Sequence, residues 1–331
     1  MKGRIAALDH LPDGRAVAAL LVDGVLHDLL VDPPEAAGPA QPGAIFWAKV
    51  GRPMKGMGGA MVDLGGGHTG FLREAKGLSP GAMLAVQVTT VTEPGKAAPV
   101  TRRILFKSRY AIVTPDKPGR NLSRQITDEE ERLRLTELAA EAMEAEPKDI
   151  GLILRSAAAG ATEVEVAEDI AAMLSLARDV ASEAGDAPSL LVDAPGAHLL
   201  AWREWADPEP DQVLAEDGSF EALGLWDTLP GAVGPRAELG QGAFAYIEPT
   251  RALVSVDVNT GQDTTPAAAL KANVAALRML PLALRLRGLA GQVTCDLAPT
   301  SKRERTQLEQ VLRAAIKADG SEMSVAGWTP L

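Results

Sequence analysis

Two short apolar segments that each run into an aspartate constrain this chain more than any other feature. The first, 253–259, contains Asp257 and ends at Asn259, and the second, 292–296, ends at Asp296. The first contains three Val and the second one Val and one Thr, residue types that are typical of buried strands. Because an unpaired carboxylate is costly to desolvate, we expect a cation or hydrogen bonds to hold these two.

The alternation of a strand would bring these polar groups together. Side chains two residues apart share a face, so Asp257 and Asn259 point the same way. A helical pattern lies between the two segments, opened by Pro266, and its apolar positions share one face. These positions are Leu270, Val274, Leu277 and Leu284. The pattern predicts a strand, helix, strand unit, in which Asp296 reaches the same site if the second strand pairs beside the first.

Paired carboxylates that leave positions open for water favour Mg²⁺ or Mn²⁺, hard ions that typically serve phosphate chemistry. A second interpretation is open for each aspartate alone. An aspartate at a strand end is commonly a turn or helix-cap residue, and Asn-Thr-Gly at 259–261 has good turn chemistry.

The two segments resemble ordered blocks of the ribonuclease E and ribonuclease G family of bacterial endoribonucleases. Residues 251–259 resemble the family's first catalytic strand, and 284–296 resemble its second. The resemblance implies Asp257 and Asp296 as ligands of Mg²⁺, and Asn259 as the residue that orients the scissile phosphate. Asn273 also falls where the family has an asparagine. By resemblance, cleavage of single-stranded RNA would leave a 5′-phosphate and a 3′-hydroxyl.

The resemblance continues upstream and implies an α+β fold of four parts. These are an RNase H-like subdomain from residues 1–42 and 190–228, an inserted S1-type OB barrel that binds RNA at 43–100, a 5′-sensor-like region at 101–189, and a DNase I-like catalytic subdomain at 229–331. The residues themselves predict a β-hairpin near the N-terminus, because Asp23-Gly24 separates two apolar runs.

Two further sets of residues match family sites that contact RNA. Phe71 and Lys96 match an aromatic residue and a lysine with which the family's barrel grips a single strand, and Met61 takes the second aromatic position. A thioether cannot stack like a ring, so part of a base-stacking energy of about 1–3 kcal/mol is lost. The alternative for Phe71 is a residue of the barrel core.

Arg155 and Ser156 resemble the family's sensor for a 5′-monophosphate. A guanidinium and a hydroxyl together satisfy several phosphate oxygens. Ser108 replaces a glycine of the family, and Glu322 falls near its second arginine. Because a carboxylate repels phosphate, we expect sensing to be weakened.

Charge and cysteine content limit the possible partners. The net charge of −11 opposes non-specific RNA binding, although basic residues gather between Arg102 and Arg124. Neither a run of about 18 apolar residues nor a signal-peptide core is visible, so we expect a cytoplasmic protein without a membrane segment. The single Cys295 excludes a cysteine zinc cluster within one chain, and the sequence ends before the family's zinc-link segment and small domain. We therefore expect no zinc, and an oligomer that does not depend on a zinc link.

Two functions follow from these observations. The first is a Mg²⁺-dependent endoribonuclease acting on single-stranded RNA, favoured by Asp257, Asn259 and Asp296. The second is a catalytically weak RNA-binding or regulatory protein of the same fold, favoured by Met61 and by the altered sensor residues.

Overall fold

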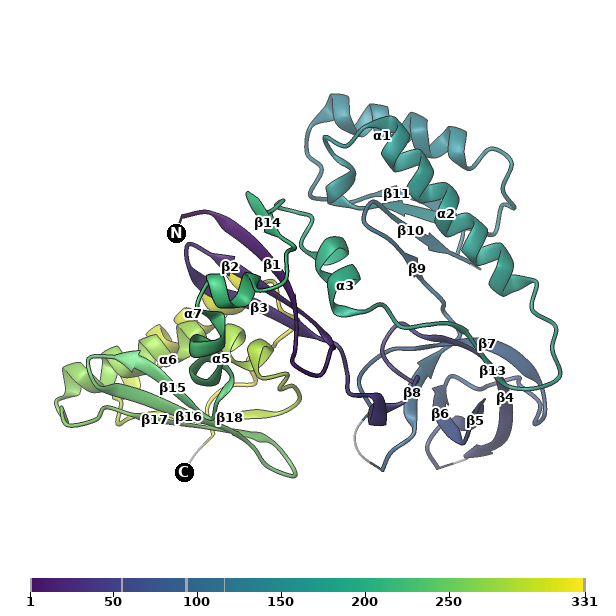
Figure 1. The fold of residues 1–331 in the computed structure, drawn as a ribbon. Coiled ribbons are helices and arrows are strands. Elements are labelled where there is room, and N and C mark those ends of the chain that lie inside the picture. Colours follow the sequence, from purple (N-terminus) through teal and green to yellow (C-terminus); the bar gives the residue numbers. More distant parts are fainter. Residues whose placement is uncertain (1, 55, 93–94, 116, 330–331) are drawn as a thin grey trace. The chain divides into compact units, whose positions relative to one another are not determined.

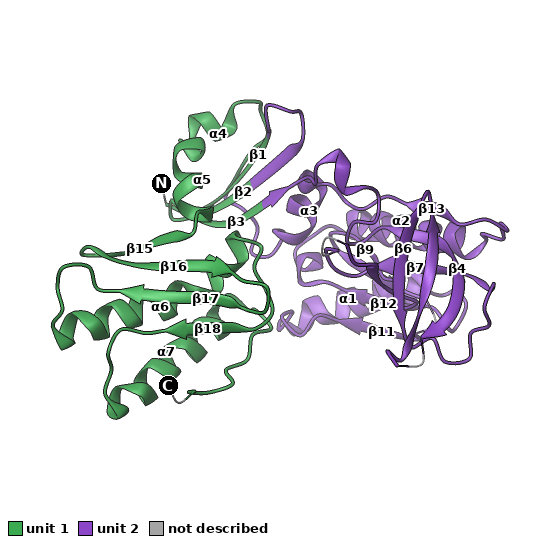
Figure 2. Ribbon diagram, turned by 90° about the horizontal axis from the view of Figure 1, so that it is seen from below, with its two compact units in different colours: residues 1–9, 19–29, 212–331 green, residues 10–18, 30–211 purple. Residues whose placement is uncertain are grey.

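In the computed structural model the chain is a mixed α/β protein whose described residues are 2–54, 56–92, 95–115 and 117–329 (Figure 1). It divides into two compact units, coloured separately in Figure 2. Unit 1 comprises Met1–Asp9, Ala19–Leu29 and Gln212–Leu331, and unit 2 comprises His10–Ala18 and Leu30–Asp211. Each unit is described by itself.

The N-terminal sheet contains the predicted hairpin. Its strands run in the order β14-β1-β2-β3. Their bounds are Arg4–His10 for β1, Ala16–Val22 for β2, Val25–Val31 for β3 and Gln212–Leu214 for β14. Asp23 and Gly24 join β2 to β3 with φ angles of 51° and 81°. A two-residue hairpin turn of this kind requires positive φ at both positions, so the hairpin prediction is confirmed.

Five strands of unit 2 close into a barrel. They are β4 (Ile45–Met54), β5 (Gly59–Gly65), β6 (His68–Arg73), β7 (Met83–Val88) and β8 (Ala98–Thr101). Pairing runs β4-β5-β6-β8-β7, and β7 pairs back to β4. Phe46, Val62 and Leu72 are among the buried side chains of its core. A small closed barrel of this kind is consistent with an S1 or OB-type domain. A further strand, β13 (Ser189–Val192), pairs antiparallel with β4.

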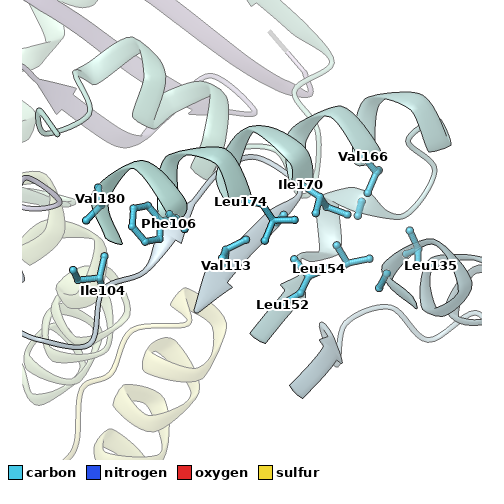
Figure 3. Close-up of a cluster of buried hydrophobic side chains, with 14 of the residues drawn as sticks. Ile104, Phe106, Val113, Leu135, Leu152, Leu154, Val166, Ile170, Leu174 and Val180 are labelled. Atoms are coloured by element: carbon cyan, nitrogen blue, oxygen red, sulfur yellow. The ribbon is translucent and has the colours of Figure 1, made fainter. Parts of the chain in front are cut away.

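Unit 2 also contains a separate four-stranded sheet with two helices. Its strands, in the order β11-β12-β10-β9, are β9 (Phe106–Lys107), β10 (Ala111–Thr114), β11 (Gly119–Leu122) and β12 (Gly151–Leu154). The helices are α1 (Glu129–Ala142) and α2 (Glu163–Ala181), and a capping box between Thr162 and Glu165 starts α2. In Figure 3, side chains on one face of α2 point at the strands. These are Val166, Ile170, Leu174 and Val180, at the spacing that an amphipathic helix requires.

Short helices follow in both units. α3 (Ala197–Glu204) belongs to unit 2, whereas α4 (Ser219–Ala222) and α5 (Leu225–Val233) belong to unit 1. Within unit 1, the carboxylate of Asp9 accepts a hydrogen bond of 2.9 Å from the backbone N–H of Phe220. This bond ties α4 to the end of β1.

The C-terminal part of unit 1 is an open sheet with helices on one face. The strands, in the order β15-β16-β17-β18, are β15 (Arg236–Gly240), β16 (Ala243–Pro249), β17 (Val254–Asn259) and β18 (Val293–Asp296). The helices are α6 (Pro266–Leu286), which packs on the sheet, and α7 (Lys302–Asp319), which packs on α6. The predicted strand, helix, strand unit is confirmed, because β17 and β18 are parallel neighbours joined through α6.

The buried face of α6 differs from the predicted leucine stripe. Leu270 and Val274 are only half-buried, while the alanines Ala269, Ala272 and Ala276 are buried. Small side chains let a helix lie close to a sheet, which explains why alanines occupy the buried face of α6. By length and composition α6 is the one helix of the described residues that could cross a membrane, yet half of its apolar window is buried in unit 1, as in a core helix.

Candidate functional site

The two aspartates lie side by side on neighbouring strands. β17 and β18 are neighbouring strands of one sheet (Figure 1). They run parallel in a register that pairs Asp257 with Asp296 and Val256 with Cys295. Register partners on adjacent parallel strands point to the same face, with backbones about 4.8 Å apart. The condition set by the sequence, that the second strand pairs beside the first, is therefore met.

The expectation that these carboxylates are buried is wrong. Val254, Val256 and Val258 point into the core, whereas Asp257 and Asp296 are exposed on the other face of the sheet. Helices cover only one face, so the alternating residues between the valines meet water. No desolvation cost has to be offset, and the pairing of the two strands, rather than burial, brings the two carboxylates together.

Asn259 lies next to Asp257 on the open face. Its Nδ2 donates a 2.9 Å hydrogen bond to Oδ2 of Asp257, which holds the amide beside the carboxylate. Among the described residues, the ion pairs involve neither Asp257 nor Asp296. Exposed carboxylate oxygens beside an amide are the hard donors that Mg²⁺ and Mn²⁺ accept, so these residues fit such an ion.

A buried asparagine fixes the segment that leaves β18. Asn273 of α6 is fully buried, donates to the carbonyl of Ala298 at 3.0 Å and accepts from the N–H of Ala298 at 2.9 Å. Ala298 follows Asp296 by two residues, so the clamp sets where the carboxyl end of β18 lies. The sequence marked Asn273 only through the resemblance. The physical signal in the sequence was a single amide among alanines on the apolar face of a helix, where a buried amide needs hydrogen-bond partners.

Cys295 lies on the opposite face of β18 from Asp296. Its side chain is partly buried against the core of unit 1, and burial raises the pKa of the thiol to about 11. The thiol is therefore protonated at neutral pH and does not take part in the open face.

On the barrel, Phe71 and Met61 are neighbours. β5 and β6 pair Met61 with Phe71, and both side chains are half-buried on the outside, while Leu72 points into the core. The alternative that Phe71 belongs to the barrel core is therefore wrong. Lys96 is exposed just before β8, the strand whose Pro99 pairs with Phe71.

Arg155 is already engaged within unit 2. Its Nη1 donates to the carbonyls of Ser108 at 2.6 Å and Arg203 at 3.0 Å, and its Nη2 donates to Glu204 at 2.8 Å. Glu204 also pairs with Lys107 at 2.8 Å and with Arg203 at 2.7 Å. One carboxylate thus faces three cations, brought together from three distant segments. Sequence reasoning found neither Glu204 nor the cluster.

The charges of this cluster act on its titrating groups. Burial alone would raise the pKa of Glu204, but the hydrogen bond and charge of Lys107, with Arg155 and Arg203, hold it below its usual range. Burial lowers the pKa of Lys107, the hydrogen bond and charge of Glu204 raise it in part, and repulsion from Arg155 and Arg203 adds to the lowering, so that it stays below its usual value. Glu204 therefore stays ionised to a lower pH than an ordinary glutamate, and its single negative charge faces three cations.

The other predicted sensor residues have separate places. The buried Ser108 hydroxyl is hydrogen-bonded to Asp169 and to the carbonyl of Ala111, and it closes the turn between β9 and β10. Ser156 follows Arg155 and is half-buried. Glu322 is exposed and belongs to unit 1, whereas Arg155 belongs to unit 2. Its predicted effect on a terminal phosphate stays a prediction.

Fold and site together define a mixed α/β protein with a closed five-stranded barrel and a pair of carboxylates on an open sheet. A model described as the Ribonuclease E/G family matches residues 106–220 and 211–331. The chain belongs to this family.

Curated relatives cover nearly the whole chain. Ribonuclease E of Nostoc sp. (strain PCC 7120) is 28% identical over 95% of this chain and 53% of the relative. Ribonuclease E of Synechocystis sp. (strain PCC 6803) is 27% identical over 95% of this chain and 54% of the relative. Ribonuclease G of Escherichia coli (strain K12) is 26% identical over 95% of this chain and 75% of the relative. The chain thus spans about half the length of the two ribonuclease E relatives.

Proposed function

We propose that this chain is a Mg²⁺-dependent endoribonuclease that cleaves single-stranded RNA. One observation carries the proposal: Asp257 and Asp296 are register partners on parallel strands, with Asn259 bonded to the first of them. The names of the relatives support the class of reaction, since both ribonuclease E and ribonuclease G act on RNA by name.

In this proposal Asp257 and Asp296 hold Mg²⁺, or Mn²⁺, through their exposed oxygens. When bound, the ion would supply an activated water and stabilise charge on the phosphate. Asn259 fixes the carboxylate of Asp257 through Nδ2 and orients the scissile phosphate from the same face. Cleavage leaves a 5′-phosphate and a 3′-hydroxyl.

In the same proposal, residues on the barrel bind the single-stranded RNA. Phe71 offers a ring for stacking on the outside of the barrel, Met61 offers an apolar neighbour, and Lys96 contributes charge. The four subdomain boundaries, the RNase H-like and DNase I-like assignments and the cytoplasmic location belong to the same proposal.

A second function is favoured by the state of Arg155. Because Nη1 and Nη2 already donate to Glu204 and two carbonyls, a 5′-phosphate that binds through these N–H groups must compete with bonds already made. A catalytically weak RNA-binding or regulatory protein would show this pattern together with Met61 in place of an aromatic residue.

Cleavage of a fluorescent single-stranded RNA, with Mg²⁺ or with EDTA, separates the two functions. We expect Mg²⁺-dependent cleavage that Asp257→Asn and Asp296→Asn each abolish, while circular dichroism and the melting temperature stay near those of the unchanged chain. Asp227→Asn removes an exposed aspartate of α5 in the same unit and should retain full cleavage. Full cleavage by either active-face variant contradicts the metal assignment, and binding without any cleavage supports the second function.

A further inference from the structure

The open face that carries the carboxylates also carries an exposed aromatic ring. β16 pairs with β17 so that Tyr246 lies opposite Asp257 and Phe244 lies opposite Asn259. Tyr246 is 39% exposed, although its chain neighbours Ala245 and Ile247 are buried. One row of register partners therefore runs Tyr246, Asp257, Asp296 across three strands.

Neighbouring side chains hold this ring in place. The rings of Phe244 and Tyr246 meet edge to face, with centroids 5.6 Å apart and planes at 81°. On the next strand Arg236 lies opposite Tyr246, and its Cζ is 4.2 Å from the centroid of Phe244. Arg236 is in turn paired with Glu238 at 3.1 Å. The ring of Phe244 thus contacts both Tyr246 and Arg236, while Tyr246 keeps a large part of its surface exposed to water.

The charge of this face limits how it can bind RNA. Glu238, Glu248, Asp257 and Asp296 are all exposed on it, and Arg236 is its one cation among the described strand residues. A polyanion is therefore not attracted here by charge until a cation is bound. Stacking does not need favourable charge, because every base has a π-face on which an aromatic ring can pack.

We propose that Tyr246, supported by Phe244, stacks the base of a nucleotide adjacent to the scissile phosphate. The proposal rests on the proposed function, since it takes the carboxylate pair as the place of that phosphate. Tyr246 lies on the β-strand next to that of Asp257, and the two backbones are about 4.8 Å apart. An RNA strand whose scissile phosphate is at the carboxylates therefore passes over the ring. The occupant is a nucleobase of a single strand, because the faces of bases in a duplex are already stacked.

The binding test does not depend on catalysis. A single-stranded RNA with one 2-aminopurine, moved along the strand in a series, is titrated with the full chain carrying Asp257→Asn, so that the RNA stays intact. At one position we expect strong quenching, which Tyr246→Ala removes and Tyr246→Phe keeps, together with about tenfold weaker binding in Tyr246→Ala, or roughly 1.4 kcal/mol. Leu133→Ala, which truncates an exposed apolar side chain of α1, should change neither quantity.

The cleavage test uses the unchanged chain and an RNA with one abasic nucleotide. Beside the cleavage site the missing base should raise KM about tenfold in the unchanged chain and in Tyr246→Phe. In Tyr246→Ala, KM is already raised and the abasic nucleotide should add nothing, since the lost partner is the same. A purely structural role for Tyr246 would leave the abasic penalty intact.

The outcomes separate this inference from the proposed function. If the unchanged chain cleaves RNA but neither the quenching nor the abasic increase in KM depends on Tyr246, the stacking site is overturned and the proposed nuclease function stands. Quenching that depends on Tyr246 without any cleavage overturns the nuclease, and it keeps a base-stacking site on this face. A chain that neither cleaves nor shows Tyr246-dependent quenching overturns both.

Discussion

The clamp between Asn273 and Ala298 allows a sharp test of how the carboxylate pair is positioned. Asn273→Ala removes both hydrogen bonds at once, and it leaves the N–H and the carbonyl of Ala298 without partners at a residue that is 6% exposed. Because Ala298 follows Asp296 closely, we expect the end of β18 to loosen and the two carboxylates to lose their register.

The expected magnitude follows from the two bonds. A buried polar group left without a partner costs about 1–3 kcal/mol, so two such groups cost roughly 2–6 kcal/mol. A domain is typically stable by about 5–15 kcal/mol, so the loss is a large part of the stability of unit 1. Water that enters the gap would bring the cost to the lower end of this range.

The single thiol reports the opening of β18 directly. Cys295 lies between Thr294 and Asp296 on the core side, and the raised pKa of its thiol makes it slow to react at neutral pH. Pulses of a maleimide reagent should label Asn273→Ala much faster than the unchanged chain. Hydrogen exchange should rise in peptides from β17 and β18, while peptides from β4 in the barrel serve as the internal reference.

A second substitution at the same position gives a pH signature. In Asn273→Asp the carboxylate would face the carbonyl of Ala298, so burial and repulsion raise its pKa in the folded state. The variant should therefore be least stable relative to the unchanged chain at neutral pH, and the difference should shrink as the pH falls below the raised pKa, because the acid can then donate. Labelling of Cys295 at an unchanged rate in both variants would refute the clamp.

Three further outcomes are expected. 5′-monophosphorylated and 5′-hydroxyl forms of one oligonucleotide should be cleaved at rates within about tenfold, because Arg155 is already bonded, and a preference of about a hundredfold that Arg155→Ala removes would contradict this. Glu204→Gln should destabilise unit 2 by about 2 kcal/mol at neutral pH, as measured by denaturant unfolding. Since the pKa of Glu204 is lowered when folded, this difference should persist above about 4.5 and vanish as the pH falls through the lowered value. Phe71→Ala should weaken RNA binding by about 1–3 kcal/mol in a filter assay with little change in melting temperature, because the ring lies outside the barrel.

The strand, helix, strand unit could be predicted because its signals are local. Thr265 and Pro266 start α6, apolar residues recur at helical spacing, and two short strands flank it. The exposure of Asp257 could not be settled in the same way. Alternating Ser-Val-Asp-Val-Asn fits a half-buried strand, but which face is covered depends on where α6 packs, and that is a tertiary fact.

The parts that sequence reasoning missed depend on contacts between distant segments. The contacts of Glu204 with Lys107 and Arg155 join three distant segments that only the fold of unit 2 brings together. Tyr246 is a different case, because an aromatic residue in an apolar strand is indistinguishable from a core residue until the open face is known. The period of two along β16 appears only in the burial of Ala245 and Ile247, not in the residue types, which are apolar throughout 243–247.

Exposure of the carboxylate pair also decides how metal binding relates to folding. Two charges about 5 Å apart in water repel by only about 1 kcal/mol, so the sheet can hold Asp257 and Asp296 together without an ion. A buried pair would have needed the metal to fold, because its desolvation would have to be offset. We therefore expect EDTA to stop cleavage without unfolding unit 1, and replacement of one aspartate by asparagine to cost no stability. The register of β17 and β18 is held instead by the valine core and by the Asn273 clamp, so residues that contact neither metal nor RNA set the geometry of the site.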